Sequence, residues 1–159
     1  MVTGQPGEVR HNDDGTETIV LHRTFADPIE DVWAAITESD RLARWIGHYE
    51  GTGGTGGTVE FTTTGELDAG GEVDEPATVQ IVECSPPHRL VVDMPSYDGG
   101  VWHLAATLSG HGSGTTLVFE QRLTAGVPAG DIEAGWRWYL DRLVASIADE
   151  PMPAWDDYT

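Results

Sequence analysis

The feature that most constrains this chain is an apolar stripe near its C-terminal end. Its members are spaced at i, i+4, i+7, i+8, i+11 and i+15, which places them on one face of an α-helix. They are Ile132, Trp136, Tyr139, Leu140, Leu143 and Ile147. A helix with so large an apolar face must bury it against another layer of the fold. The sequence therefore predicts a long C-terminal helix packed on a second element of comparable size.

Strand patterns separated by turn residues can supply that second element. We predict a strand over 16–25 and six more over 48–51, 58–63, 77–84, 89–94, 101–108 and 115–123. Gly- and Pro-rich segments separate these strands at hairpin length, which is typical of a meandering antiparallel sheet. Val9 and Arg10 are candidates to pair back on the first strand through a turn at 11–15.

Two short helices are predicted between the first strand and the second. Asp27 is the expected N-cap, Pro28 suits the first helical position, and Glu30 completes a capping box. The apolar face of this helix consists of Ile29, Val32, Trp33 and Ile36. Ser39 is expected to cap the second helix, which Gly47 ends. Its inner face consists of Leu42, Trp45 and Ile46.

Several short motifs accompany this order of elements. They are Arg23-Thr24-Phe25 followed by Pro28 and Val32-Trp33, then Arg41-Leu42-Ala43-Arg44-Trp45, Glu83-Cys84-Ser85-Pro86-Pro87-His88-Arg89-Leu90, Gly114-Thr115-Thr116-Leu117, and Gly135-Trp136 with Leu140 and Leu143. With them, residues 16–148 resemble the START-like (SRPBCC, Bet v 1-like) superfamily, and within it the domain related to the activator of Hsp90 ATPase. Residues 1–15 form a polar N-terminal segment. Residues 149–159 form an acidic tail, which is either a disordered end or docks through Trp155 and Tyr158.

The resemblance implies an α+β helix-grip fold. A curved seven-stranded antiparallel sheet would carry two short helices after its first strand and the long helix over its concave face, with a cavity between them. Independently, one helix and a curved sheet cannot fill their concavity without large side chains. The candidates to line this cavity are Trp33, Trp45, Phe61, Trp102, Leu104, Ala106, Phe119, Gln121, Ile132, Trp136, Tyr139 and Leu140. The tryptophans are either cavity wall or solid core, and Gln121 either orients a ligand or meets a backbone group or water.

The sequence offers little catalytic or metal-binding chemistry. The G-x-G-x-x-G at 51–56 precedes a strand pattern instead of opening a helix, so we interpret it as a hairpin loop and not a dinucleotide site. The six His and the single Cys84 do not have zinc-site spacing, and we expect no metal and no cofactor. Cys84 is interpreted as a small core residue. Glu83 and Glu120 could act as acid or base only if they turned into the cavity, and an outward orientation is favoured.

Charge excludes several classes of partner. The chain has 27 acidic residues against 8 basic ones, all Arg, for a net charge of -19. Nucleic acid and anionic membranes need basic surfaces, so neither is an expected partner. The composition fits either a genome rich in Arg codons or a high-salt cytoplasm. One cysteine, no signal-peptide layout and no apolar run of about 20 residues predict a cytoplasmic location.

Three functions follow, in order of preference. The first is binding of a small apolar or amphipathic ligand in the cavity. The second, implied by the resemblance, is a module that binds a chaperone or another protein. The third is a cavity enzyme like the superfamily's aromatase/cyclases; without an acid–base pair we rank it last. The expected oligomeric state is a monomer or a homodimer.

Overall fold

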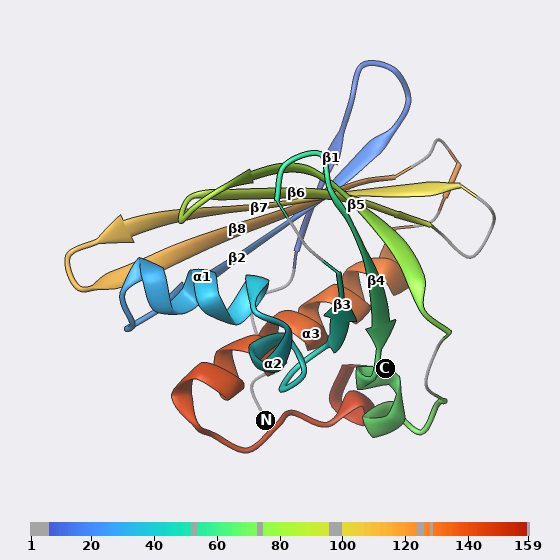
Figure 1. Ribbon diagram of the computed structural model, residues 1–159. Coiled ribbons are helices and arrows are strands. Elements are labelled where there is room, and N and C mark those ends of the chain that lie inside the picture. The colour runs from blue at the N-terminus through green and yellow to red at the C-terminus, as the bar shows by residue number, and fades with distance from the viewer. Residues whose placement is uncertain are drawn as a thin grey trace.

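An eight-stranded antiparallel sheet forms the frame of the molecule, and the helices lie on one side of it (Figure 1). The computed structural model describes residues 7–51, 54–72, 75–95, 100–123, 126–127 and 129–158. The strands are β1 (Glu8–His11), β2 (Glu17–Phe25), β3 (Gly47–Glu50), β4 (Thr58–Thr63), β5 (Ala77–Ser85), β6 (Arg89–Pro95), β7 (Val101–His111) and β8 (Gly114–Leu123). Their order across the sheet is β1-β2-β8-β7-β6-β5-β4-β3. This arrangement confirms the predicted meander.

Helices follow the predicted positions. They are α1 (Ile29–Thr37), α2 (Ser39–Leu42) and α3 (Gly130–Ala148), with two short 3₁₀ helices, η1 (Gly65–Ala69) and η2 (Trp155–Tyr158). In Figure 1, α3 runs across the concave side of the curved sheet, and α1 and α2 lie on that same side. The helix-grip fold is thus confirmed. Within the described residues, none of the helices is long and apolar enough to cross a membrane.

The strand count differs from the prediction of seven. The additional strand is β1, which pairs antiparallel with β2, from Glu8 opposite Val20 to His11 opposite Glu17. This is the pairing for which Val9 and Arg10 were candidates. The pairing covers the outer edge of β2, which would otherwise expose unpaired backbone groups.

The predicted helix caps are wrong in detail. Pro28 occupies the cap position of α1, and no side-chain cap hydrogen bond is present. Asp27 instead uses its backbone carbonyl to accept a 2.8 Å hydrogen bond from Thr115 Oγ1 on β8. Glu38, not Ser39, is at the cap position of α2. Tertiary contacts have overridden the local capping preference at both sites.

Ser39 and Gly47 connect α2 to the sheet. The Ser39 hydroxyl lies 2.9 Å from both the backbone N and the backbone O of Tyr49, so it fastens β3 to α2. Helix α2 ends at Leu42, and Gly47 is the first residue of β3 instead of a helix terminator. A Cβ on Gly47 would lie 2.2 Å from the carbonyl oxygen of Thr62, so the close approach of β3 and β4 requires glycine there.

The C-terminal segment docks on α3, which settles the alternative left open by the sequence. The Trp138 indole nitrogen donates a 3.0 Å hydrogen bond to the carbonyl of Pro153, and the Trp138 and Trp155 rings meet edge to face at 5.2 Å. Tyr158 is buried and donates a 2.5 Å hydrogen bond to Asp141 Oδ2. Helix α3 is therefore covered by the sheet on one face and by the tail on another.

Candidate functional site

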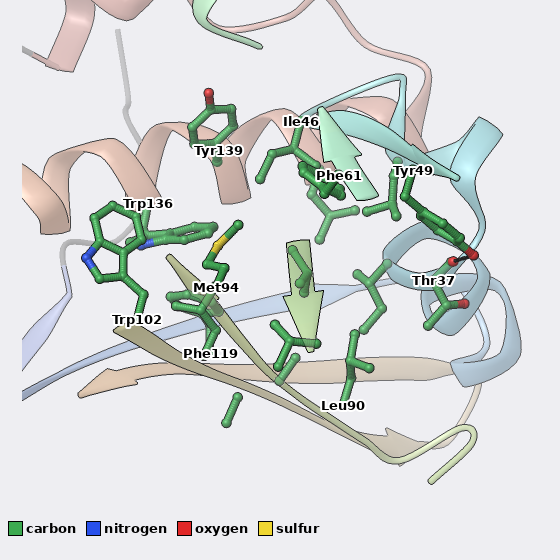
Figure 2. Close-up of a pocket in the computed structure, with 18 of the residues that line it drawn as sticks. Thr37, Ile46, Tyr49, Phe61, Leu90, Met94, Trp102, Phe119, Trp136 and Tyr139 are labelled. Atoms are coloured by element: carbon green, nitrogen blue, oxygen red, sulfur yellow. Dashed lines mark hydrogen bonds between the residues drawn. The ribbon is translucent and has the colours of Figure 1, made fainter. Parts of the chain in front are cut away.

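A cavity of about 820 Å³ lies between the concave face of the sheet and α3. Every strand from β3 to β8 contributes to its wall, together with α1, α2 and α3. Figure 2 shows Trp102 and Trp136 toward one end of it and Thr37 and Tyr49 toward the other. Its volume is within the range of sites that hold small organic molecules.

The buried core explains why this space is hollow. The main cluster joins α1 and α3 to β2, β7 and β8, and a second, smaller cluster of Val59, Val79 and Ile81 lies on β4 and β5. Phe61 and Val92 contact both clusters. The largest packed core therefore lies on β2, β7 and β8, and the cavity extends from it over β3 to β6.

All of the predicted cavity residues except Trp33 and Gln121 line the wall. Those that do are Trp45, Phe61, Trp102, Leu104, Ala106, Phe119, Ile132, Trp136, Tyr139 and Leu140. Trp33 is half-buried and packs against the main core on α1 instead. Gln121 is fully buried outside the wall. Whether any of these residues contacts a ligand stays a prediction.

Gln121 meets neither of the partners considered from sequence. Its Oε1 accepts a 2.5 Å hydrogen bond from the Trp136 indole nitrogen. The Trp136 ring also packs on Phe119, with ring centroids 4.4 Å apart. The Trp136 indole is thus fixed by two residues of β8, Phe119 and Gln121, at a place where Trp136 lines the cavity.

Of the half of the wall formed by Ile46 and the strands β3 to β6, only Phe61 was predicted from sequence, and the rest was missed. It includes Ile46, Tyr49, Val79, Val92 and Met94. The alternating pattern of β5, in which Val79 and Ile81 are buried and Gln80 and Val82 exposed, was a usable signal for the inward face. Cys84, at the end of that strand, is half-buried and also lines the cavity.

The cavity reaches the surface at its polar end. Glu38 and Gly54 line it and are exposed. Beside them the Tyr49 hydroxyl donates a 2.7 Å hydrogen bond to the carbonyl of Thr37, and the Thr37 hydroxyl donates one of 2.7 Å to the carbonyl of Trp33. Burial raises the pKa of Tyr49, and the negative charge of Glu38 raises it further. The phenol therefore stays protonated and keeps its role as a donor to Thr37.

The two carboxylates considered for acid–base chemistry do not line the cavity. Glu83 pairs with Arg89 at 3.5 Å, and Glu120 pairs with Arg10 at 3.9 Å. Their ion pairs support the outward orientation favoured from sequence. Among the residues that the structure describes, no group of three His, Cys, Asp or Glu side chains could hold a metal ion.

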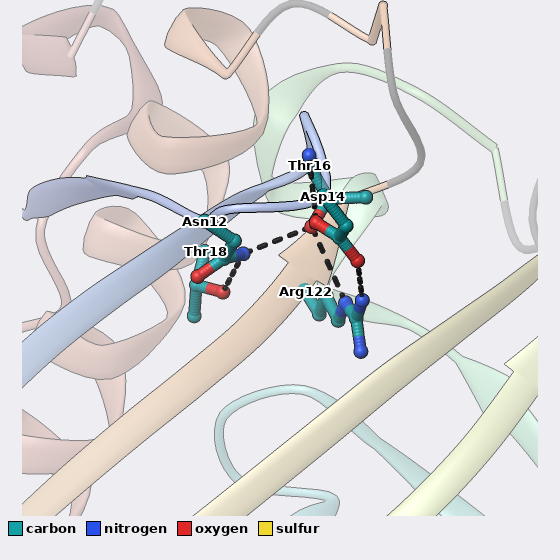
Figure 3. A network of polar contacts seen from close by, with 5 residues as sticks. All are labelled: Asn12, Asp14, Thr16, Thr18 and Arg122. Carbon is teal, nitrogen blue, oxygen red and sulfur yellow. Dashed lines mark hydrogen bonds and ion pairs between the residues drawn. The ribbon is translucent and has the colours of Figure 1, made fainter.

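A separate polar network fastens the β1–β2 hairpin to β8 (Figure 3). Asp14 accepts hydrogen bonds from the Thr16 hydroxyl at 2.6 Å and the Thr16 backbone N–H at 3.0 Å, and it forms an ion pair with Arg122. The Thr16 contacts, followed by the charge of Arg122, lower the pKa of Asp14. Asn12 donates to the hydroxyls of Thr16 and Thr18. None of these side chains lines the cavity between the sheet and α3.

Solved structures similar to this chain share its fold. The crystal structure of CalU16 from Micromonospora echinospora has a TM-score of 0.73 and 25% identity, over 97% of this chain and 91% of that chain. DynU16, a protein in the dynemicin biosynthetic locus, has a TM-score of 0.69 and 21% identity over 85% of this chain and 49% of that chain, so this chain spans about half of it. BPP1335 from Bordetella parapertussis has a TM-score of 0.69 and 24% identity, over 99% of this chain and 94% of that chain.

Sequence comparison identifies the family. No curated protein matches the chain. The family model described as "Activator of Hsp90 ATPase homolog 1-like protein" matches residues 26–148, from two residues before the α1 cap position through the end of α3. Because this match spans well over half of the chain, the protein belongs to the activator of Hsp90 ATPase homolog 1-like family.

Proposed function

We propose that this protein binds a small hydrophobic or amphipathic molecule inside the cavity between α3 and the sheet. The observation that carries this proposal is an 820 Å³ space whose wall is built mainly from aromatic and aliphatic side chains. Moving apolar ligand surface out of water into such a site stabilises the complex by about 25 cal/mol per Å². Protein interiors are normally close-packed, without voids of this size. A cavity this large therefore supports a role in holding a ligand.

The similarity to DynU16 adds a modest argument. That protein is described as belonging to a biosynthetic locus, a setting in which small molecules are produced. Its identity to this chain is 21%, which supports a shared fold and no shared ligand. The proposal therefore rests on the cavity and not on this neighbour.

Thermal unfolding with a panel of apolar ligands tests the proposal. A ligand at one hundred times its Kd should stabilise the folded state by about 2.7 kcal/mol and raise Tm accordingly. Ala106→Phe and Val92→Phe place a ring in the cavity and should weaken binding, because both side chains line it. Val82→Phe is the matched control, since Val82 is on β5 but is 47% exposed and lies outside the wall.

Two outcomes would contradict ligand binding. One is a panel in which no compound changes Tm. The other is stabilisation that is equal in Ala106→Phe, Val92→Phe and Val82→Phe, which would place the compound elsewhere on the protein.

The family match favours a second candidate, a module that binds a chaperone. The family's description names the Hsp90 ATPase, and the match runs through residues 26–148. The test is the steady-state ATPase rate of purified Hsp90 with increasing amounts of this chain. A rate that does not change, together with no binding in calorimetry, would exclude this candidate. An enzyme remains the third candidate, and the outward ion pairs of Glu83 and Glu120 do not support it.

A further inference from the structure

The polar end of the cavity presents hydrogen-bond acceptors. The hydroxyl protons of Tyr49 and Thr37 are both used within the protein, in hydrogen bonds to backbone carbonyls. Each hydroxyl oxygen retains lone pairs that can accept a further hydrogen bond. Glu38, next in the chain and also part of the wall, adds a carboxylate, which only accepts. A ligand group placed here meets three acceptors, the hydroxyl oxygens of Thr37 and Tyr49 and the negatively charged carboxylate of Glu38.

Of the three tryptophans in the wall, Trp102 lies at the end of the cavity opposite Tyr49 (Figure 2), and the other two do not offset this bias. The Trp45 indole nitrogen donates a 2.9 Å hydrogen bond to the carbonyl of Ala35, and the Trp136 indole nitrogen donates to Gln121. An indole has a single N–H, so both of these donors are already used. A ligand oxygen beside either ring would meet an apolar surface.

Positive charge is also missing from the wall. The sequence contains no Lys, and no Arg or His is among the described residues that line the cavity. Arg142 contacts a residue of the wall, because its Nε donates a 2.8 Å hydrogen bond to the carbonyl of Trp45. Its guanidinium pairs with Asp68 at 2.9 Å, so its charge is already matched. A buried ligand carboxylate would therefore have no counter-charge, which is strongly unfavourable.

We propose that the cavity selects amphiphiles whose polar end donates hydrogen bonds, as an alcohol or an ammonium group does, and rejects the carboxylate with the same apolar body. The polar end of the ligand lies beside Thr37, Glu38 and Tyr49, and the apolar body extends toward Trp102 and Trp136 (Figure 2). This inference rests on the proposed function, because it names the ligand class of the same cavity.

A matched series of fluorescent probes tests the selection. Pyrenemethylamine, pyrenemethanol and pyrenecarboxylate share one apolar body and differ in charge at neutral pH. The full chain is titrated with each, and Kd is measured from pyrene emission. The amine and the alcohol should bind at least about tenfold more tightly than the carboxylate, because an unpaired buried charge is costly. The difference should persist from about 0.15 M to about 0.5 M NaCl, which screens the long-range field of the whole protein.

Glu38→Gln locates the polar end. The substitution should raise the Kd of the amine by about two- to fivefold, which is the effect of losing a solvent-accessible ion pair, and leave the Kd of the alcohol unchanged. Glu30→Gln is the control, since Glu30 is exposed on α1 and does not line the cavity. Equal effects of the two substitutions on the amine would overturn the placement of the polar end beside Glu38.

The outcomes separate this inference from the proposed function. A carboxylate that binds as tightly as the alcohol, or a preference that disappears in high salt, overturns the selection while leaving cavity binding in place. If none of the three probes binds, the proposed function fails for this ligand class, and the selection fails with it.

Discussion

The Trp136 indole nitrogen lies 2.5 Å from Oε1 of Gln121, in a hydrogen bond between α3 and β8 beneath the cavity wall. An indole N–H can only donate, so this contact fixes the orientation of the Gln121 amide. Gln121 is 0% exposed, and its Nε2 has no hydrogen-bond partner among the described residues. The buried amide is therefore held by one hydrogen bond, from Trp136.

A double-mutant cycle should show strong coupling between these two residues. Trp136→Phe removes the donor and leaves both ends of the Gln121 amide unsatisfied, which should cost about 2–4 kcal/mol of unfolding free energy. Adding Gln121→Leu removes the orphaned amide and should recover about 1–2 kcal/mol of that loss. Urea unfolding of the wild type, both single variants and the double variant measures the coupling. Additive effects would show that the hydrogen bond contributes no net stability.

The fold could be predicted from sequence because each element carries a local signal. The apolar stripe from Ile132 to Ile147 defines α3, since no strand would place those residues on one face. The bounds of β4, Thr58–Thr63, match the prediction because Gly-rich segments flank it. The caps at Asp27 and Ser39 could not be predicted, because their partners, Thr115 and Tyr49, are brought to them by tertiary structure.

The candidate site could be predicted on one side, whereas on the other only Phe61 was predicted. The large residues of α3, β7 and β8 point to a shared interface through their spacing alone. The opposite wall depends on where the helices stop covering the sheet, and no local pattern encodes that boundary. Gln121 shows the same limit: alternation in β8 places it on the inner face, but only the packed structure shows that Trp136 lies over it.

The C-terminal tail should contribute to stability through Tyr158. Its hydroxyl donates a 2.5 Å hydrogen bond to Asp141 Oδ2, while Asp141 Oδ1 pairs with Arg23 Nε at 2.9 Å. Tyr158→Phe should lower the unfolding free energy by about 1.5–3 kcal/mol, as expected for a hydrogen bond to a charged group. Chemical denaturation measures the change. Asp156→Asn, at an exposed position of the same short helix, is the control and should change stability by less than about 0.5 kcal/mol.

Stability should fall at alkaline pH because of the same residue. Burial, and next the hydrogen bond to Asp141, raise the pKa of Tyr158. A folded-state pKa above the unfolded value of about 10 gives a contribution that is complete below pH 10 and is lost as the pH rises toward the folded value. Denaturant midpoints measured from pH 8 upward should decline less steeply in Tyr158→Phe than in the wild type. An identical decline with pH in both proteins would show that ionisation of Tyr158 does not contribute to the loss of stability. Because the pKa of Tyr49 is also raised, Tyr49→Phe measures the contribution of that residue separately.

The ion pair of Arg142 and Asp68 should respond asymmetrically to mutation. Arg142 is 4% exposed and also donates to the Trp45 carbonyl, whereas the Asp68 side chain is 62% exposed. Asp68→Asn should cost about 1–2 kcal/mol, because the amide oxygen can still accept a hydrogen bond but the buried guanidinium loses its counter-charge. Arg142→Leu should cost about 3–5 kcal/mol, because it also breaks the hydrogen bond to Trp45 and the packing of the guanidinium on the Trp138 ring at 4.8 Å. Calorimetry measures the unfolding free energy of both variants. Equal losses in the two would contradict this expectation.

Two glycines should respond in opposite directions to the same change. In Gly47→Ala, the new Cβ would lie 2.2 Å from the Thr62 carbonyl oxygen, so β3 and β4 must separate. The lost pairing and strain should cost about 2 kcal/mol or more. Gly135→Ala is the matched control on α3, where nothing lies within 4 Å of the added methyl group, and it should raise stability by about 0.5–1 kcal/mol. Because β3 carries Tyr49 into the cavity wall, Gly47→Ala should also weaken binding of any ligand held there. Paired urea titrations and probe-binding curves measure both effects, and a Gly47→Ala variant as stable as the wild type would contradict the close approach of the two strands.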